Sequence, residues 1–242
     1  MEIKLVSKTM PIIDGLLDSE DLVTYTARIS NPSNQKDIKN APELLKYLID
    51  HEHWSPFEHV SVTFEITTSR AIAAQINRHR SFAFQEFSQR YSKITNLESF
   101  NARRQSAANI QSSEEFLQLP DEIVENIKQH LIDSVSYYEL LLKEGVSKEC
   151  ARMVLPMCTQ TTLYMTGTLR SWIHYVNLRT KPDTQLEHRE IAEAIKEQLF
   201  HEYPNIGKAL GWYENVPEEN FEMCNHPSGD CGEHVQHFIT EQ

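Results

Sequence analysis

The 242-residue chain has little glycine, few cysteines and no long apolar segment. Its seven glycines favour long helices over a fold built from many tight turns. Four cysteines in a chain of this length do not make a secreted disulfide scaffold, so we expect reduced thiols. No run approaches the roughly 20 apolar residues that cross a bilayer, and the N-terminal segment MEIKLVSKTM lacks the apolar core of a signal peptide. We therefore expect a cytoplasmic protein with no membrane partner.

Positive charge is also scarce. The chain has 23 Lys and Arg residues against 35 Asp and Glu, a formal net charge of -12. This acidic balance argues against broad attraction to DNA, RNA or anionic lipid. We expect no nucleic-acid partner, and any phosphate that the protein binds must be held by a local arginine pocket.

Hydrophobic spacing predicts an α+β fold in a single domain, with a small, mostly antiparallel sheet packed against a helical bundle. The expected strands cover residues 1–8, 60–68 and 161–168. The expected helices cover residues 19–29, 37–50, 69–80, 121–144, 169–179 and 184–200, with a shorter one from Ser147 to Pro156. Ser19 or Asp21 is expected to cap the first helix, and Ser69 the third. Residues 101–119 are polar and patternless, which predicts a loop.

No internal repeat, linker or low-complexity tract divides the chain. We expect one catalytic domain over residues 1–217 and a tail of unknown role over 218–242. The tail contains four side chains that can ligate zinc, Cys224, His226, Cys231 and His234. Their spacing does not match the common zinc motifs, so a flexible tail is the preferred interpretation.

Residues 78–91 read RHRSFAFQEFSQRY and concentrate basic and hydrogen-bonding side chains. Guanidinium groups bind phosphate or a delocalised anionic ring through planar, bidentate contacts. The cluster therefore indicates a ligand site. A solvated helix end with surface ion pairs is the simpler alternative, but it leaves the spacing of Ser88 and Arg90 unexplained.

The order Arg-His-Arg, seven residues, then Ser88 resembles the RHR-x7-S motif of the flavin-dependent thymidylate synthases. The similarity extends over about residues 1–210, through HWSPFEH at 53–59, ARMVLP at 151–156, RSW at 170–172 and NLR at 177–179. Enzymes of this family carry FAD, transfer a methylene group from methylenetetrahydrofolate to dUMP, and reduce it with a hydride derived from NADPH to give dTMP. They are homotetramers whose active sites are shared between subunits, so the resemblance implies a homotetramer here.

The resemblance also implies site residues. The catalytic group would be Arg179, Ser88 and His53. Along the flavin would lie Ser55, Arg78, His79, Arg80, Glu86, Thr168, Arg170 and His174. The dUMP pocket would contain Gln75, Ile76, Asn77, Arg78, Glu86, Phe87, Ser88, Gln89, Arg90, Arg152 and Arg179.

Elementary chemistry agrees with these roles. A reduced flavin is anionic near N1, and fixed guanidinium groups stabilise such charge in a shielded site. Ser88, Arg90 and Arg152 suit phosphate. Arg179 would face the uracil and favour loss of the N3 proton, which makes C5 more electron-rich. It does so as a permanent charge and not as a base.

The chain departs from the family pattern at three positions. Gln85 stands where many members have Asn, and Asp183 where many have His. His174 stands where a related member has Asn. Gln85 keeps the amide on a longer side chain, whereas the differences at positions 183 and 174 bear on flavin contacts.

Two other functions fit parts of the pattern. One is a catalytically silent flavin- or nucleotide-binding homologue, which would bind ligands without turnover. The other is an RNA-binding module that stacks bases on Phe82, Phe84, Phe87 and Tyr91, against which the acidic balance argues.

Two local patterns carry less weight. His51, His53 and His59 lack the carboxylate or thiolate partners of a metal site, so we expect no metal. Cys158 is interpreted as a structural thiol.

Overall fold

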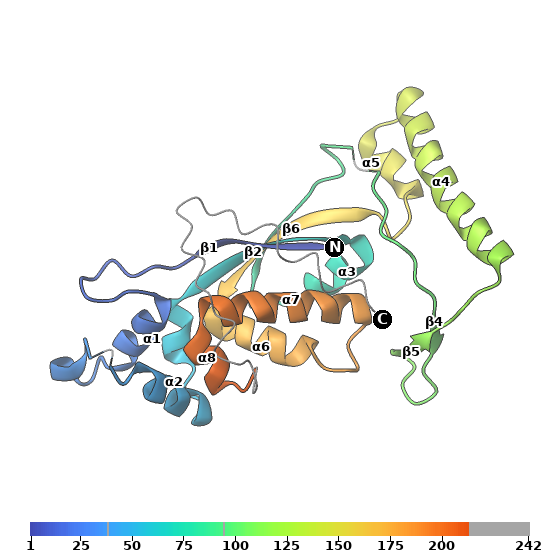
Figure 1. Cartoon of the computed structure of the whole chain (residues 1–242). Coiled ribbons are helices and arrows are strands. Elements are labelled where there is room, and N and C mark those ends of the chain that lie inside the picture. Colours follow the sequence, from blue (N-terminus) through green and yellow to red (C-terminus); the bar gives the residue numbers. More distant parts are fainter. Residues whose placement is uncertain (38, 94, 213–242) are drawn as a thin grey trace. The chain divides into compact units, whose positions relative to one another are not determined.

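Four antiparallel strands form the central sheet, in the order β1-β2-β6-β3 (Figure 1). The strands are β1 (Glu2–Lys8), β2 (Ser61–Ser69), β3 (Ala83–Glu86) and β6 (Gln160–Thr168). This computed structural model describes residues 1–37, 39–93 and 95–212, which belong to one unit, Met1–Trp212. The predicted α+β class and antiparallel sheet are confirmed.

Strands β2 and β6 make the centre of the sheet, paired from Ser61 opposite Thr168 to Ser69 opposite Gln160. One face of β2 is buried, as the alternating sequence predicts, because Val62, Phe64 and Ile66 point into the core. The same face carries Leu163 and Met165 of β6.

The described part of the chain has eight α-helices. They are α1 (Ser19–Ala27), α2 (Ala41–Asp50), α3 (Arg70–Ile76), α4 (Asp121–Lys143), α5 (Lys148–Ala151), α6 (Leu169–Arg179), α7 (Leu186–Glu202) and α8 (Pro204–Ala209). Short 3-10 segments cover Pro32–Asn34, Ser55–His59 and Arg152–Val154. Helix α6 packs on the buried sheet face through Trp172, whose ring centroid lies 4.9 Å from that of Phe64 and whose Nε1 donates to the Val62 carbonyl at 3.0 Å.

The two central strands each continue directly into a helix. The Ser69 hydroxyl caps α3 by accepting a hydrogen bond from the Ile72 amide at 3.4 Å. The Thr168 hydroxyl caps α6 in the same way, from the Ser171 amide at 3.3 Å. These caps satisfy amides that a helix start leaves without partners, so they fix where α3 and α6 leave the sheet.

Gly167 on β6 permits close packing with the segment that follows α3. A Cβ atom at this position would lie 2.4 Å from the Phe82 ring. The Phe82 ring in turn lies 4.6 Å from that of Trp172, centroid to centroid. Phe82 therefore contributes to the core beside α6.

Several sequence predictions of helix ends are wrong, among them those of α1 and α3. The α1 cap is Asp18, not Ser19 or Asp21, because the Asp18 carboxylate accepts from the Asp21 amide at 2.9 Å. Helix α3 ends at Ile76, four residues before the predicted end at Arg80. The chain turns there to enter β3, so Arg78 and His79 lie in a turn and not on the helix.

The prediction of a structureless loop at 101–119 is also wrong. Strands β4 (Arg103–Gln105) and β5 (Ser113–Phe116) pair there as an antiparallel hairpin. Side-chain bonds support it, including one from Arg103 Nε to the Ser113 hydroxyl at 2.9 Å. Such polar bonds produce no hydrophobic period in the sequence.

No described helix is long and apolar enough to cross a membrane. Over residues 1–37, 39–93 and 95–212, no group of three or more His, Cys, Asp or Glu side chains is placed to hold a metal ion. Cys150 and Cys158 are free thiols. Cys224, His226, Cys231 and His234 lie outside the described residues.

Candidate functional site

The turn after α3 meets the last residue of α6. Arg179 Nε donates a hydrogen bond to His79 Nε2 at 2.9 Å. Since Nε2 accepts, the neutral His79 ring carries its proton on Nδ1. Burial, and then the neighbouring charge of Arg179, lower the pKa of His79 to about 4. His79 is therefore an uncharged support for a permanently charged guanidinium.

A second histidine, His188 of α7, extends this group and was missed by the sequence analysis. Its Nε2 lies 3.0 Å from the Tyr175 hydroxyl, and its Nδ1 lies 3.3 Å from Gln75 Oε1. The Tyr175 ring also packs edge-on against His79, with centroids 4.9 Å apart. We call Gln75, His79, Tyr175, Arg179 and His188 the α3–α6–α7 cluster.

Amphipathic patterning holds a signal for His188. The residue belongs to the buried stripe of α7, with Ile191, Ala192 and Ile195. A histidine on an apolar face must find polar partners inside the protein. The partners themselves come from two distant segments, which the pattern cannot identify.

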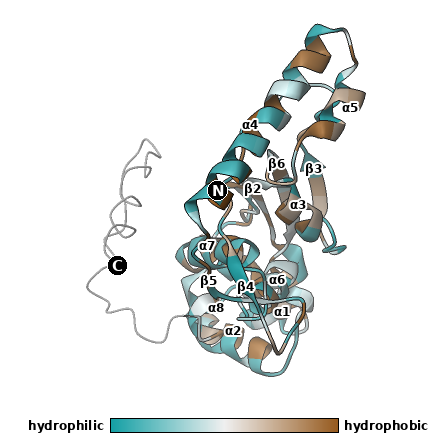
Figure 2. Cartoon of the chain, turned by 90° about the vertical axis from the view of Figure 1, so that its right-hand side faces the viewer, coloured by the Kyte–Doolittle hydropathy of each residue, from teal (hydrophilic) through white to brown (hydrophobic). Residues whose placement is uncertain are grey.

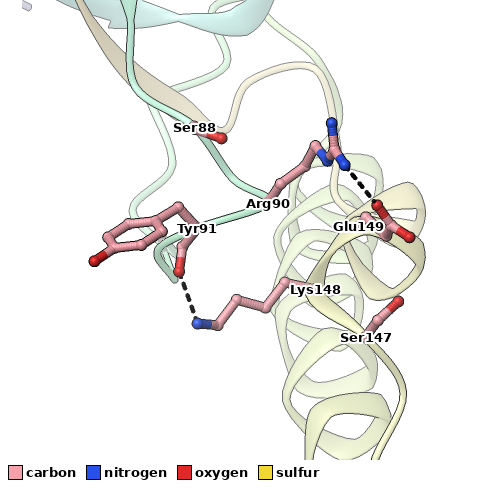
Figure 3. A pocket seen from close by; sticks show the side chains of 6 residues that line it. All are labelled: Ser88, Arg90, Tyr91, Ser147, Lys148 and Glu149. Atoms are coloured by element: carbon pink, nitrogen blue, oxygen red, sulfur yellow. Dashed lines mark hydrogen bonds and ion pairs between the residues drawn. The ribbon is translucent and has the colours of Figure 1, made fainter.

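A separate cavity of about 450 Å³ lies where the motif reaches Ser88 and Arg90 (Figure 3). It is lined by Ser88, Arg90, Tyr91, Ser147, Lys148 and Glu149, which we call the Ser88–Arg90 pocket. The Arg90 guanidinium pairs with the Glu149 carboxylate at 3.2 Å, and Lys148 Nζ donates to the Tyr91 carbonyl at 2.7 Å. Both arginine and carboxylate are more than half exposed, so an incoming anion can displace the pair.

Arg152 begins the short 3-10 segment that follows α5. Its Nε lies 3.4 Å from the Glu149 carbonyl. This places a third cation close in sequence and space to Lys148 and Glu149. The pocket thus combines a hydroxyl with several cationic groups, a donor set that suits a phosphate.

Glu86, at the end of β3, is held by three donors. Asn77 Nδ2 donates to it at 3.0 Å, the Thr161 hydroxyl donates at 3.0 Å, and Arg70 pairs with it at 3.2 Å. These bonds draw the start of the motif turn, β3 and β6 together. Glu86 and Asn77 therefore form one hydrogen-bonded unit.

A third region gathers residues expected near a flavin. Arg170, on the first turn of α6, forms an ion pair with Glu58. Ser55 and His53 are exposed on the same segment as Glu58, and the exposed His174 packs against Trp54 at a centroid distance of 5.2 Å. The Thr168 hydroxyl is occupied as the α6 cap.

The remaining expected residues differ in exposure. Ile76 is wholly buried in the core, so its side chain supports the site from below. Gln89 is buried, and its Nε2 has no hydrogen-bond partner within the described structure. Phe87 is half-buried, and its backbone amide donates to the Thr162 carbonyl at 2.9 Å.

Arg78 and Arg80 of the motif are exposed. Neither side chain makes a hydrogen bond or ion pair with another described residue. Two uncommitted guanidinium groups beside a hydroxyl-bearing and aromatic surface fit an anionic cofactor with phosphates and a flat ring. The residues therefore match the chemistry of FAD.

Among the described residues, the expected site residues fall into separate groups. No hydrogen bond or ion pair between described residues joins the α3–α6–α7 cluster to the Ser88–Arg90 pocket. The α3–α6–α7 cluster suits the ring of a nucleotide, and the Ser88–Arg90 pocket suits its phosphate.

Comparisons with known proteins identify the family. The family model described as "Thymidylate synthase complementing protein" matches residues 11–205. The chain is 47% identical over 215 residues to the "Probable flavin-dependent thymidylate synthase" of Paramecium bursaria Chlorella virus 1, over 88% of this chain and 100% of that one. It is 45% identical over 217 residues to the flavin-dependent thymidylate synthase of Synechocystis sp., over 88% and 100% of the two chains.

A solved structure shares the fold. The crystal structure of a UMP/dUMP methylase, PolB from Streptomyces cacaoi bound with 5-Br dUMP, has a TM-score of 0.74. The similarity covers 88% of this chain and 95% of that one, at 24% sequence identity. At this identity the likeness concerns the fold.

Proposed function

The chain belongs to the flavin-dependent thymidylate synthase family, and on that premise we propose that it converts dUMP to dTMP. Methylenetetrahydrofolate would donate the one-carbon unit, FAD would be the resident cofactor and NADPH the reductant. In the overall reaction the C5 proton of dUMP is lost, a methylene carbon is bonded to C5, and a hydride completes the methyl group. The folate leaves as tetrahydrofolate.

The observation that carries this proposal is the bond from Arg179 Nε to neutral His79. It fixes the guanidinium plane and leaves the two terminal nitrogens for a ligand. A guanidinium aimed at the N3 and carbonyl edge of uracil stabilises the charge that develops when the ring reacts at C5. Because arginine stays protonated, it acts by electrostatics and not by taking the proton.

The Ser88–Arg90 pocket would take the nucleotide phosphate. Ser88 and Arg90 offer a hydroxyl and a planar fork, and Arg152 and Lys148 add positive charge. The ion pair between Arg90 and Glu149 must break when the phosphate binds. Glu86, Asn77, Phe87 and Gln89 would then line the nucleoside between the two groups.

FAD would be held by Arg78, Arg80, Ser55, Arg170 and His174, with His79, Glu86, Thr168 and His53 close by. When bound, it supplies the hydride that reduces the transferred one-carbon unit. Arg170 is paired with Glu58 in the absence of ligand, so binding requires that pair to open or to share a contact. The protein's own part is to orient the rings and to exclude water from the reacting carbon.

A homotetramer with shared active sites would bring the two separate clusters together. The apolar surface of α4 supports this, because Ile123, Ile132, Tyr137 and Leu140 are exposed in the single chain. Figure 2 shows hydrophobic stretches alternating with hydrophilic ones along α4. Exposed apolar side chains of this number are typical of a subunit interface.

Two measurements test the function. The purified protein should show the absorption of bound flavin, and it should release tritium from C5-labelled dUMP in the presence of methylenetetrahydrofolate and NADPH. A flavin spectrum without release would favour the silent binding homologue. Absence of flavin after reconstitution would refute the proposed cofactor.

A further inference from the structure

His188 is wholly buried and belongs to no motif of the site. From α7 it contacts α3 through Gln75 and α6 through Tyr175. We infer that His188 is a positioning residue which, together with Tyr175, holds the Gln75 amide with its N–H groups toward the substrate. The inference rests on the proposed function, because it assigns a role within the dUMP site.

The first argument starts from the Tyr175 hydroxyl. Tyr175 is buried, and His188 Nε2 at 3.0 Å is the hydrogen-bond partner of its hydroxyl within the described structure. A buried hydroxyl hydrogen without an acceptor is costly, so the hydroxyl donates to Nε2. The neutral ring then carries its proton on Nδ1 and donates it to Gln75 Oε1 at 3.3 Å.

The second argument starts from the opposite end of the same chain of bonds. Arg103 donates to the Glu187 carboxylate at 2.8 Å. Burial alone would raise the pKa of Glu187, but hydrogen bonds from Arg103, its own backbone and Gln185 bring that pKa below its ordinary value. Glu187 is therefore an ionised acceptor, and Gln185 must present Nε2 to it, at 3.0 Å.

The orientation of Gln185 then fixes that of Gln75. With Nε2 facing Glu187, Gln185 presents Oε1 to Gln75, whose Nε2 donates to it at 2.6 Å. Gln75 Oε1 is left to face His188. Two arguments from opposite ends thus give the same direction of donation, from Tyr175 through His188 into Gln75.

His188 can keep this direction because it stays neutral. Burial, then the charge of Arg179, and then that of His79 once His79 is itself protonated, lower its pKa to about 3. A protonated ring would donate from both nitrogens and leave the Tyr175 hydroxyl without an acceptor.

The two bonds of Gln75 differ in how easily a ligand replaces them. His188 is fully buried, whereas Gln185 is exposed and precedes α7. A ligand can therefore displace Gln185 and receive the Gln75 N–H instead. With its N–H facing the ligand, Gln75 favours a ligand that has an acceptor oxygen there, either a ring carbonyl or a phosphate oxygen. It disfavours a ligand that has an amino group in that position.

Three variants test the role in the FAD-loaded protein. His188→Leu removes both bonds, and we expect the KM for dUMP to rise about tenfold, the effect of one lost hydrogen bond, with kcat changed less. His188→Asn keeps an amide donor near the Nδ1 position and should restore KM to within about threefold of wild type. Tyr175→Phe keeps the ring but frees the tautomer, so KM should rise by an intermediate factor.

His201→Leu is the matched control, because His201 lies on the same helix and is exposed. Its KM for dUMP should equal that of wild type. A second readout needs no substrate: the 15N chemical shifts of His188, assigned by their loss in His188→Asn, report which ring nitrogen carries the proton. We expect the Nδ1–H form in wild type.

Calorimetric binding of dUMP and of deoxyuridine shows which oxygen of the ligand accepts the Gln75 N–H. Weakening of both ligands in Tyr175→Phe identifies a ring carbonyl, and weakening of dUMP alone identifies the phosphate. An Nε2–H tautomer, an unchanged KM in folded Tyr175→Phe, or equal losses in His188→Leu and His188→Asn would each overturn the inference. A wild-type protein with the Nδ1–H form but no turnover would refute only the proposed function.

Discussion

Arg179 and His79 are one hundred residues apart in sequence, yet Arg179 Nε lies 2.9 Å from His79 Nε2. The bond joins the end of α6 to the turn after α3. Because His79 accepts, it cannot itself be the proton acceptor for the substrate while the bond is present. In this pair, His79 therefore orients the guanidinium and Arg179 supplies the positive charge.

Arg179→Ala should keep FAD and lose most dTMP formation. Removal of a fixed charge aimed at a reacting ring costs about 10²- to 10³-fold in rate. Tritium release from C5-labelled dUMP measures the loss, and the flavin spectrum reports retained cofactor. Arg104→Ala is the control, because Arg104 is exposed and pairs with Glu115 on the hairpin. Unchanged activity in Arg179→Ala would remove the assignment.

Glu149→Gln should lower the KM for dUMP by up to about fivefold. The exposed Glu149 carboxylate competes with phosphate for Arg90, and an exposed ion pair is worth up to about 1 kcal/mol. Steady-state kinetics at low salt measure the change, which should shrink as salt is added. Glu139→Gln removes a comparable exposed partner, of Lys93, and should leave KM alone. A raised KM in Glu149→Gln would show that Glu149 helps binding.

Because of Glu20, the free energy of unfolding should fall as the pH rises toward 8. Glu20 is buried, and burial raises its pKa to about 7 despite hydrogen bonds from Ile206 and Asn205. The folded state therefore holds a proton that the unfolded state has lost above about pH 4.5. The stabilisation is complete below that pH and disappears as pH rises through 7, a loss of up to about 3 kcal/mol.

Urea unfolding of wild type and Glu20→Gln at pH 5 and pH 8 measures this effect. The buried histidines contribute with the opposite sign, because their lowered pKa values favour the folded state above about pH 6.5. That contribution is common to both proteins and cancels in the comparison. An identical pH dependence in the two proteins would contradict the prediction.

Gly167→Ala should destabilise the protein by about 1–3 kcal/mol, because the new Cβ meets the Phe82 ring. Phe82→Leu in the same chain should remove part of that cost, since it replaces the ring in contact. Denaturant unfolding of both single variants and the double variant gives the coupling energy. Strict additivity would mean that the two residues do not contact each other.

Local periodicity was enough to predict most of the regular elements, although β3 and α8 were not predicted. Val62, Phe64 and Ile66 alternate with polar residues, and β2 lies there. Elements without such a period were missed or misplaced. The 103–116 hairpin depends on polar bonds such as that from Arg103 to Ser113. Helix α1 is capped by Asp18, and the sequence pattern does not distinguish between Asp18, Ser19 and Asp21 as the cap.

The site divides in the same way. The motif spacing predicted His79, Ser88 and Arg90 as site residues, because they lie close together in sequence. It could not show that His188 supports Gln75, since that contact joins residues 113 positions apart and depends on how α7 packs. Long-range polar contacts require the fold.

The paired caps at Ser69 and Thr168 have an electrostatic consequence. Because β2 and β6 run antiparallel, α3 and α6 leave opposite ends of the sheet, and the bond between His79 and Arg179 shows that their far ends meet. The carbonyl end of a helix carries partial negative charge. The carbonyl end of α6, which carries Arg179, and that of α3, three residues before His79, therefore both favour positive charge beside this bond.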